Sequence, residues 1–245
     1  MSRTGLIVIV SIALCAGLTL ALFPFIDFWV AKTLSDSTLA SSPMMPVVRN
    51  FGLWIELLFI AFSFVALAIK LFFPRSKMLM PGRAVVFLIA TLALGPGLLV
   101  NVALKDNWGR PRPGHLKQFG GDQNFVAWWD PTGPCEKNCS FVSGEASAAF
   151  WTIAPAALAP PEWRALAYTA AIAFGVIISA SRMIMGAHFL SDAIFSGVFT
   201  FLIIWLVYAL IYRWPRTRLD EEAMQKALAR FSIYCRTAIG RLLRY

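Results

Sequence analysis

The chain has 245 residues, of which 58% are hydrophobic and only 14% are charged, and its mean hydropathy is +0.67. Because a soluble domain carries about 25% charged residues, this composition excludes an ordinary water-soluble protein and indicates a polytopic membrane protein. The net charge of +9 is assigned to membrane topology, since Lys and Arg collect on cytoplasmic loops. Nucleic-acid binding is not expected, because the chain has no long basic soluble domain.

Six apolar segments have the length needed to cross a bilayer, which predicts an all-α membrane protein with six transmembrane helices. The helices are expected at about 5–30, 47–73, 84–104, 143–160, 163–180 and 187–212. The first is interpreted as a retained membrane helix, because the run is too long for a signal peptide and no small-x-small cleavage site follows it. Pro155 is expected to kink the fourth helix.

Two regions are expected: a transmembrane domain over 1–214 and a cytoplasmic tail over 215–245. A helix is expected within the tail from Asp220, because Asp220, Glu221 and Glu222 suit a first helical turn. Apolar and basic residues then recur at helical spacing. The tail is therefore predicted to be a basic amphipathic helix on the inner leaflet, and packing on a partner or on the basic loop at 74–83 is the alternative.

Basic residues also predict the orientation of the helices. If both termini are cytoplasmic, most of the 22 Lys and Arg residues fall on the inner side. The long hydrophilic loop at about 105–142 then faces outward. In the inner membrane of a bacterium, this loop lies in the periplasm.

Two cysteines lie in this loop, in the sequence Cys135-Glu-Lys-Asn-Cys139. An oxidising compartment would join them in a small disulfide ring, and two free thiols are the alternative. A zinc site is not expected, because no second Cys pair or His pair accompanies them.

Three polar stretches flank the outward ends of the third to sixth segments, at 105–113, 139–147 and 181–192. The last contains His188, one of only two histidines, with Arg182 six residues before it and Asp192 four residues after it. If a helix begins near Ala187, His188 and Asp192 are neighbours on one helical face. The carboxylate can then hold the imidazole in one tautomer, and the arginine offers a planar fork to phosphate oxygens.

This set of residues suits phosphoryl transfer. That reaction needs positive groups around the equatorial oxygens, an in-line nucleophile and an acid for the leaving group. His188 is the predicted nucleophile. The predicted phosphate-binding residues are Lys105, Arg112 and Arg182, together with Ser143 and Gly144, whose backbone opens a helix and so forms an anion site.

The first and third stretches resemble two motifs of the type 2 phosphatidic acid phosphatase family. The matching residues are Lys105, six residues, Arg112-Pro113, and then Ser181-Arg182, five residues, His188, three residues, Asp192. Ser143-Gly144 stands at the place of the middle motif, Pro-Ser-Gly-His. The resemblance covers about 84–212. It implies an integral-membrane lipid phosphatase that works through a phospho-histidine at His188 and needs no metal or cofactor.

One position departs from the family pattern. Glu145 stands where the family has its general-acid histidine, and a Glu side chain is protonated at neutral pH only if burial or a nearby anion raises its pKa. Three readings stay open. Glu145 is an acid whose pKa rises when phosphate binds, or His115 takes part of the role. In the third reading, the leaving group needs little protonation or the protein is impaired.

Arg110 has two readings, as a residue that caps or solvates the loop or as one that reaches a lipid headgroup. The expected partners are the bilayer and a phosphorylated membrane lipid, and the oligomeric state is left open. The resemblance offers undecaprenyl diphosphate, phosphatidylglycerophosphate, phosphatidate and lipid A phosphates as substrates. A phosphotransferase that passes the phosphate to another lipid is the alternative enzyme, and a membrane transporter or scaffold is the non-enzymatic alternative.

Overall fold

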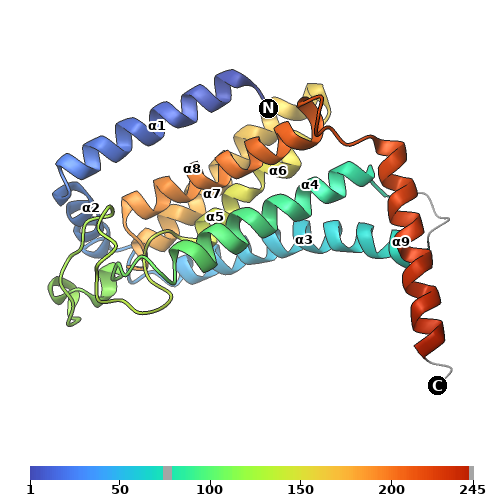
Figure 1. The fold of residues 1–245 in the computed structure, drawn as a ribbon. Coiled ribbons are helices and arrows are strands. Elements are labelled where there is room, and N and C mark those ends of the chain that lie inside the picture. The colour runs from blue at the N-terminus through green and yellow to red at the C-terminus, as the bar shows by residue number, and fades with distance from the viewer. Residues whose placement is uncertain (74–78, 243–245) are drawn as a thin grey trace.

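The protein is a bundle of helices that run side by side, with one helix lying across its end (Figure 1). The computed structural model describes residues 1–73 and 79–242, and the regular elements within these ranges are helices, as predicted. They are α1 Arg3–Leu22, α2 Phe25–Ser35, α3 Met44–Phe72, α4 Gly82–Leu92 with a π-helical continuation Ala93–Leu104, α5 Gly144–Trp151, α6 Ile153–Ala157, α7 Pro161–Ile184, α8 Leu190–Tyr208 with a π-helical continuation Ala209–Arg213, and α9 Glu221–Leu242.

Five described segments are long and apolar enough to cross a membrane. They are Arg3–Leu22, Met44–Phe72, Gly82–Leu104, Pro161–Ile184 and Leu190–Arg213. Helix α8 lies inside the bundle and contacts α1, α4, α5 and α7. The chain is therefore a multi-pass membrane protein.

The predicted fourth crossing is a broken helix, made of α5 and α6 with Thr152 between them. Pro155 has no N–H to donate to the carbonyl group one turn earlier, at Trp151, and this interrupts the helix as expected. The Thr152 hydroxyl donates to the carbonyl oxygen of Ala149 at 2.6 Å. A broken helix is tolerated at membrane depth where protein surrounds it, and α5 and α6 pack against α7.

The predicted first helix, 5–30, is wrong in its extent, because the chain forms two helices there. Helix α1 ends at Leu22 and α2 begins at Phe25. Pro24 lies between them, where its ring and its missing N–H prevent α1 from continuing. The break turns α2 under the long loop, where Asp27 is buried against the start of α8.

The N-terminus and α9 lie at the end of the bundle opposite the 105–142 loop (Figure 1). The carbonyl oxygen of Ser2 accepts a hydrogen bond from Trp205 Nε1 at 3.2 Å, and that of Met1 accepts one from Arg213 Nη1 at 3.4 Å. These contacts fix the N-terminus beside the end of α8. The N-terminus and α9 therefore share one end of the bundle.

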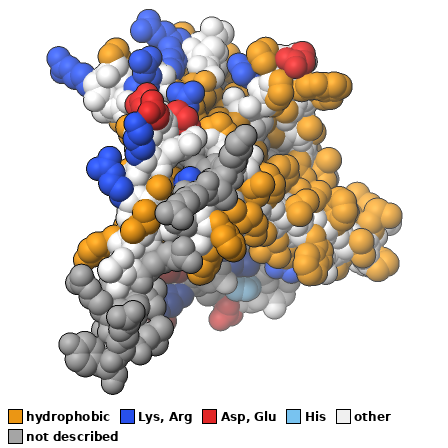
Figure 2. All heavy atoms as spheres, turned by 90° about the vertical axis from the view of Figure 1, so that its right-hand side faces the viewer, with side chains coloured by type: hydrophobic (Ala, Val, Ile, Leu, Met, Phe, Trp, Pro, Cys, Tyr) orange, Lys and Arg blue, Asp and Glu red, His pale blue; other side chains and the backbone are white. Residues whose placement is uncertain are grey.

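Helix α9 lies across the ends of α3 and α4. The Glu221 carboxylate accepts hydrogen bonds from the backbone N–H groups of Gly82 and Arg83, and the Ser232 hydroxyl donates to the carbonyl oxygen of Leu71. Figure 2 looks onto this end and shows Lys and Arg side chains gathered beside exposed hydrophobic ones. The first half of α9 is thus docked on the bundle itself. Residues 74–78 of the basic loop lie outside the described ranges.

The close approach of α5 and α7 depends on a glycine. A Cβ atom on Gly175 would lie 2.2 Å from the ring of Phe150. Small residues at such contacts let membrane helices pack closely. We predict that Gly175→Leu destabilises the protein by about 1–3 kcal/mol through overpacking. Thermal unfolding in detergent measures this, with Val176→Leu as the matched control because Val176 is exposed on the same helix. Equal melting temperatures for the two variants would contradict this packing.

Candidate active site

His188 lies in the turn between α7 and α8, and not in a helix as expected. Gly186 adopts a left-handed conformation with φ of 66°, which ends α7 at Ile184, and α8 begins only at Leu190. Asp192 caps the start of α8, because its Oδ2 accepts a hydrogen bond from the backbone N–H of Phe189 at 2.8 Å. His188 and Asp192 still form the predicted i,i+4 pair, at 3.7 Å, but they do not share one helical face.

A backbone carbonyl group, and not Asp192, orients the His188 imidazole. Nδ1 of His188 lies 2.8 Å from the carbonyl oxygen of Ser140 and 3.7 Å from Oδ2 of Asp192. The longer distance is outside hydrogen-bond range. Because a carbonyl oxygen can only accept, Nδ1 carries the proton and Nε2 keeps its lone pair. Asp192 contributes its nearby negative charge, and Ser140 fixes the tautomer.

Burial keeps this imidazole uncharged. Only 2% of His188 is exposed. Burial is the main cause that lowers its pKa below the usual 6.5, although the charge of Asp192 acts in the opposite direction. A neutral imidazole with a free Nε2 is the form that can act as a nucleophile.

A buried cluster of charged residues lies next to His188, on the side of Asp192. Nη1 of Arg110 donates to Asp192 Oδ1 at 2.6 Å, and Nη2 donates to Asp27 Oδ2 at 2.8 Å. The Ser140 hydroxyl donates to Asp192 Oδ2 at 2.5 Å. Arg110 is fully buried, so it is neither solvated nor placed as a headgroup ligand, but it does cap the loop, because its Nε donates to the Val126 carbonyl oxygen at 3.0 Å. Its charge is used inside the protein to hold two carboxylates.

The side chain of Lys105 reaches the start of α5, where the anion site is predicted. A Cβ atom on Gly144 would lie 3.3 Å from Lys105 Nζ and 2.7 Å from Asn101 Oδ1, so a larger residue there would push these side chains away. The Ser143 hydroxyl caps α5 by accepting from the N–H of Ala146 at 3.3 Å. Burial and then the charge of Arg112 lower the pKa of Lys105. The structure thus brings Lys105, Ser143 and Gly144 together.

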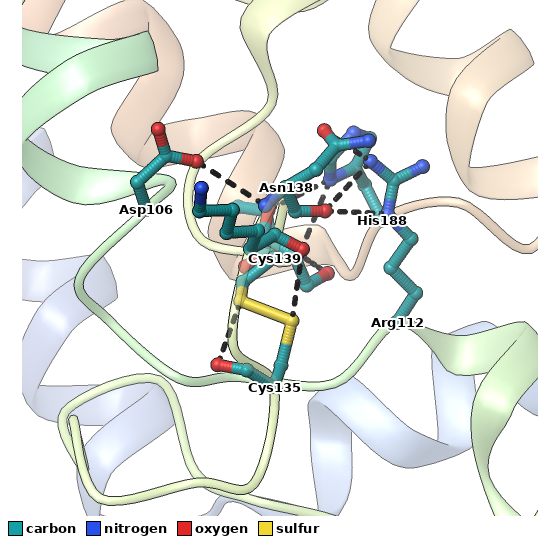
Figure 3. The surroundings of a disulfide bond; sticks show 9 residues. Asp106, Arg112, Cys135, Asn138, Cys139 and His188 are labelled. Carbon is teal, nitrogen blue, oxygen red and sulfur yellow. Dashed lines mark hydrogen bonds and ion pairs between the residues drawn. A yellow bond between two sulfur atoms is a disulfide. The ribbon is translucent and has the colours of Figure 1, made fainter.

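Arg182 carries a donor that has no acceptor. Its Nε is buried and lacks a hydrogen-bond partner among the described residues, and it lies 3.4 Å from Glu145 Oε2 in an ion pair. The contact with Glu145 is too poorly aligned to count as a hydrogen bond, so a well-placed phosphate oxygen would give this donor a better acceptor. Arg112, the remaining predicted cation, lies near His188 (Figure 3).

Glu145 is held between two guanidinium groups. Arg49, from α3, donates from Nε to Oε2 and from Nη2 to Oε1, both at 2.8 Å, and Arg182 lies on the other side. Two cations stabilise the ionised carboxylate relative to the acid. Sequence reasoning missed the role of Arg49, because a single basic residue in an apolar segment was its only signal.

His115 and the two cysteines belong to the 105–142 loop, which borders the site. The Gly114 N–H donates to the carbonyl oxygen of Gly186 at 2.9 Å, which places this loop against the His188 turn, but the His115 side chain is exposed. Cys135 and Cys139 are joined by a disulfide. The described residues contain no group of three or more His, Cys, Asp and Glu side chains placed to hold a metal ion.

The fold and the site define an integral-membrane phosphatase. The PAP2 superfamily pattern matches residues 83–216, and the chain belongs to this superfamily. It is 39% identical over 166 residues to Lipid A 4'-phosphatase of Francisella tularensis subsp. novicida (strain U112), covering 67% of this chain and 72% of that protein. It is 42% identical over 106 residues to Lipid A 4'-phosphatase of Rhizobium leguminosarum, covering 43% of this chain and 46% of that protein.

A solved structure has the same fold. The transmembrane PAP2 type phosphatidylglycerolphosphate phosphatase from Bacillus subtilis superposes with a TM-score of 0.57 at 19% identity, over 86% of this chain and 98% of that one. The family match and the Francisella relative make the protein a phosphoric monoester hydrolase that acts on a membrane lipid.

Arg110 and Arg112 are two residues apart and serve as matched variants. Arg110→Met leaves Asp27 and Asp192 buried without their cation, so we predict a loss of about 3–5 kcal/mol of stability. Arg112→Met removes a partly exposed cation, so we expect a loss below about 1 kcal/mol, together with a strong loss of activity. Thermal unfolding and phosphate release, measured on both, test this. A wild-type melting temperature for Arg110→Met would show that the cluster is not needed for folding.

Proposed function

We propose that the protein removes a phosphate monoester from lipid A or a closely similar envelope lipid. The observation that carries the chemistry is the free Nε2 of His188, which feels the charges of Arg112 and Lys105. The relatives named Lipid A 4'-phosphatase support the choice of lipid. A lipid keeps its acyl chains in the bilayer while its phosphate reaches a site at the end of the bundle.

In the proposed reaction, Nε2 of His188 attacks phosphorus and the bond to the leaving oxygen breaks. The equatorial oxygens bind to Lys105, Arg112 and Arg182, and to the N–H groups at the start of α5, where Ser143 and Gly144 lie. These groups stabilise the charge that spreads over the oxygens in the transition state. Water then hydrolyses the phospho-histidine and restores the free imidazole. The proposed chemistry needs no metal.

Glu145 is proposed to supply the proton to the leaving oxygen only after the substrate has bound. In the free enzyme, Arg49 and Arg182 favour its ionised form. A bound phosphate takes Arg182 as its own partner and brings a negative charge close to Glu145. Both changes favour protonation of Glu145, which makes it an acid at the step that needs one.

The site is proposed to face the periplasm from the inner membrane of a bacterium, with both termini and the 215–245 tail in the cytoplasm. The loop that carries the site lies at one end of the bundle, and the N-terminus and α9 lie at the other. The excess of Lys and Arg near the termini supports a cytoplasmic position for that end.

The two histidines provide a direct test of the nucleophile. Purified protein given a lipid A substrate with a labelled phosphate should form an acid-labile phospho-enzyme and release phosphate with and without a chelator. We predict that His188→Ala abolishes both and that His115→Ala changes them less than about twofold. Labelling that persists in His188→Ala would contradict the mechanism. Label transferred to an acceptor lipid instead of to water would identify a phosphotransferase.

The acid role of Glu145 is tested by comparing two leaving groups. An alkoxide leaving group needs a proton, whereas the phenolate of p-nitrophenyl phosphate does not. We predict that Glu145→Gln lowers kcat on the lipid phosphate by about 10²–10⁴-fold, with a much smaller loss on the aryl ester. Glu145→His, which restores the family residue, should retain activity. An equal loss on both substrates, or no loss on either across pH, would rule out the acid role.

A further inference from the structure

One short segment, residues 138–140, contacts both Arg112 and His188, which are two of the groups proposed to meet the phosphate (Figure 3). It overlaps the start of the middle polar stretch, 139–147, and belongs to neither the first nor the third. Its last residue, Ser140, accepts from His188 Nδ1 through its carbonyl oxygen at 2.8 Å. Its first residue, Asn138, lies against Arg112. The nucleophile and one phosphate-binding cation are thus positioned by residues two apart in sequence.

Asn138 holds the Arg112 guanidinium with several hydrogen bonds. Nε and Nη2 of Arg112 donate to the Asn138 carbonyl oxygen at 3.2 and 2.9 Å, and Nη2 also donates to Asn138 Oδ1 at 2.8 Å. A guanidinium held in this way is already oriented for an anion, which reduces the entropy lost when phosphate binds. Asn138 has a φ of 53°, a conformation that Asn tolerates better than most residues.

Backbone hydrogen bonds tie the same segment to the first polar stretch. The Cys139 N–H donates to the carbonyl oxygen of Lys105 at 3.0 Å, and the Ser140 N–H donates to that of Arg110 at 2.8 Å. These bonds set the backbone that carries Lys105 and Arg112. The segment therefore connects the two cations of the first stretch with the nucleophile of the third.

The disulfide closes a five-residue ring whose last residues are Asn138 and Cys139. The ring is joined to the first stretch at its other end too, because the Cys135 N–H donates to the carbonyl oxygen of Gly109 at 3.0 Å. Cys139 is fully buried, whereas Asn138 is exposed. Without the disulfide, Asn138 is held by fewer contacts. These are the hydrogen bond from its N–H to Asp106 Oδ1 at 3.3 Å and its hydrogen bonds with Arg112.

We propose that Asn138 and Ser140 are positioning residues of the phosphatase, and that the Cys135–Cys139 disulfide holds them in place for phosphate binding. This inference rests on the proposed function, because it takes Arg112 and His188 as the groups that meet the phosphate. The oxidised protein has an assembled site. Reduction by a dithiol, which gives its two electrons to the disulfide and yields two thiols, releases Asn138 and lets Arg112 leave the site.

The test compares oxidised and reduced wild-type protein in detergent, with thiol titration to verify each state. We expect dithiothreitol to lower kcat/KM on the lipid phosphate and to weaken binding of inorganic phosphate, measured by calorimetry, by roughly tenfold to hundredfold. The Cys135→Ser/Cys139→Ser variant should show the reduced values and no response to dithiothreitol. Glu136→Gln, an exposed change inside the same ring, is the control and should behave as wild type.

A double-mutant cycle separates positioning from general destabilisation. Asn138→Ala should weaken phosphate binding in the wild type but have no further effect when combined with Arg112→Met, because it acts only through that side chain. Additive losses in the double variant would overturn the proposal. Verified reduction without any change in phosphate binding or kcat/KM would overturn it as well. If the proposed function itself is wrong, the oxidised wild type will neither bind phosphate nor hydrolyse the lipid, and the inference falls with it.

Discussion

The buried guanidinium of Arg110 is the interaction on which the rest of the site depends. It joins α2 to α8 by binding Asp27 and Asp192, which are 165 positions apart in the sequence. Two carboxylates buried without a cation would be costly, and the cluster offsets that cost with hydrogen bonds from the Ser140 hydroxyl and the Ser191 N–H. The cluster fixes the first turn of α8. The His188 turn ends there, so the nucleophile takes its place from a buried cluster of one guanidinium and two carboxylates.

Burial divides the charged residues of the site into two groups. Beneath His188, Arg110 and its carboxylates satisfy one another and are closed to solvent. The second group combines the described cations Lys105, Arg112, Arg182 and Arg49 with the carboxylate of Glu145. This second group has an excess of positive charge, and its Arg182 Nε makes no hydrogen bond to the described residues. An anion with several oxygens suits that arrangement, and a phosphate monoester is such an anion.

The sequence predicted those parts of the molecule that leave a local pattern. Apolar run length predicted the membrane crossings, and Pro155 predicted the broken fourth crossing. Motif spacing singled out His188, Arg182, Lys105 and Arg112, whose roles in phosphoryl transfer are proposals. It could not predict contacts between distant positions, such as Asp27 with Arg110 or Arg49 with Glu145, because no spacing rule connects them. The carbonyl oxygen of Ser140 was equally hidden, since every residue has one. The helical placement of His188 failed because Gly186 adopts a left-handed conformation that ends α7, and α8 begins only at Leu190.

The central claim is that His188 Nε2 attacks a phosphorus atom held by the cations of the motif stretches. A structure of the protein with vanadate bound tests it most directly, because vanadate mimics the five-coordinate phosphorus of the transition state. The account predicts vanadium bonded to His188 Nε2, with equatorial oxygens within hydrogen-bond distance of Arg182 Nε, Arg112 and Lys105. Vanadate bonded to His188 Nδ1, or held away from His188 altogether, would contradict it.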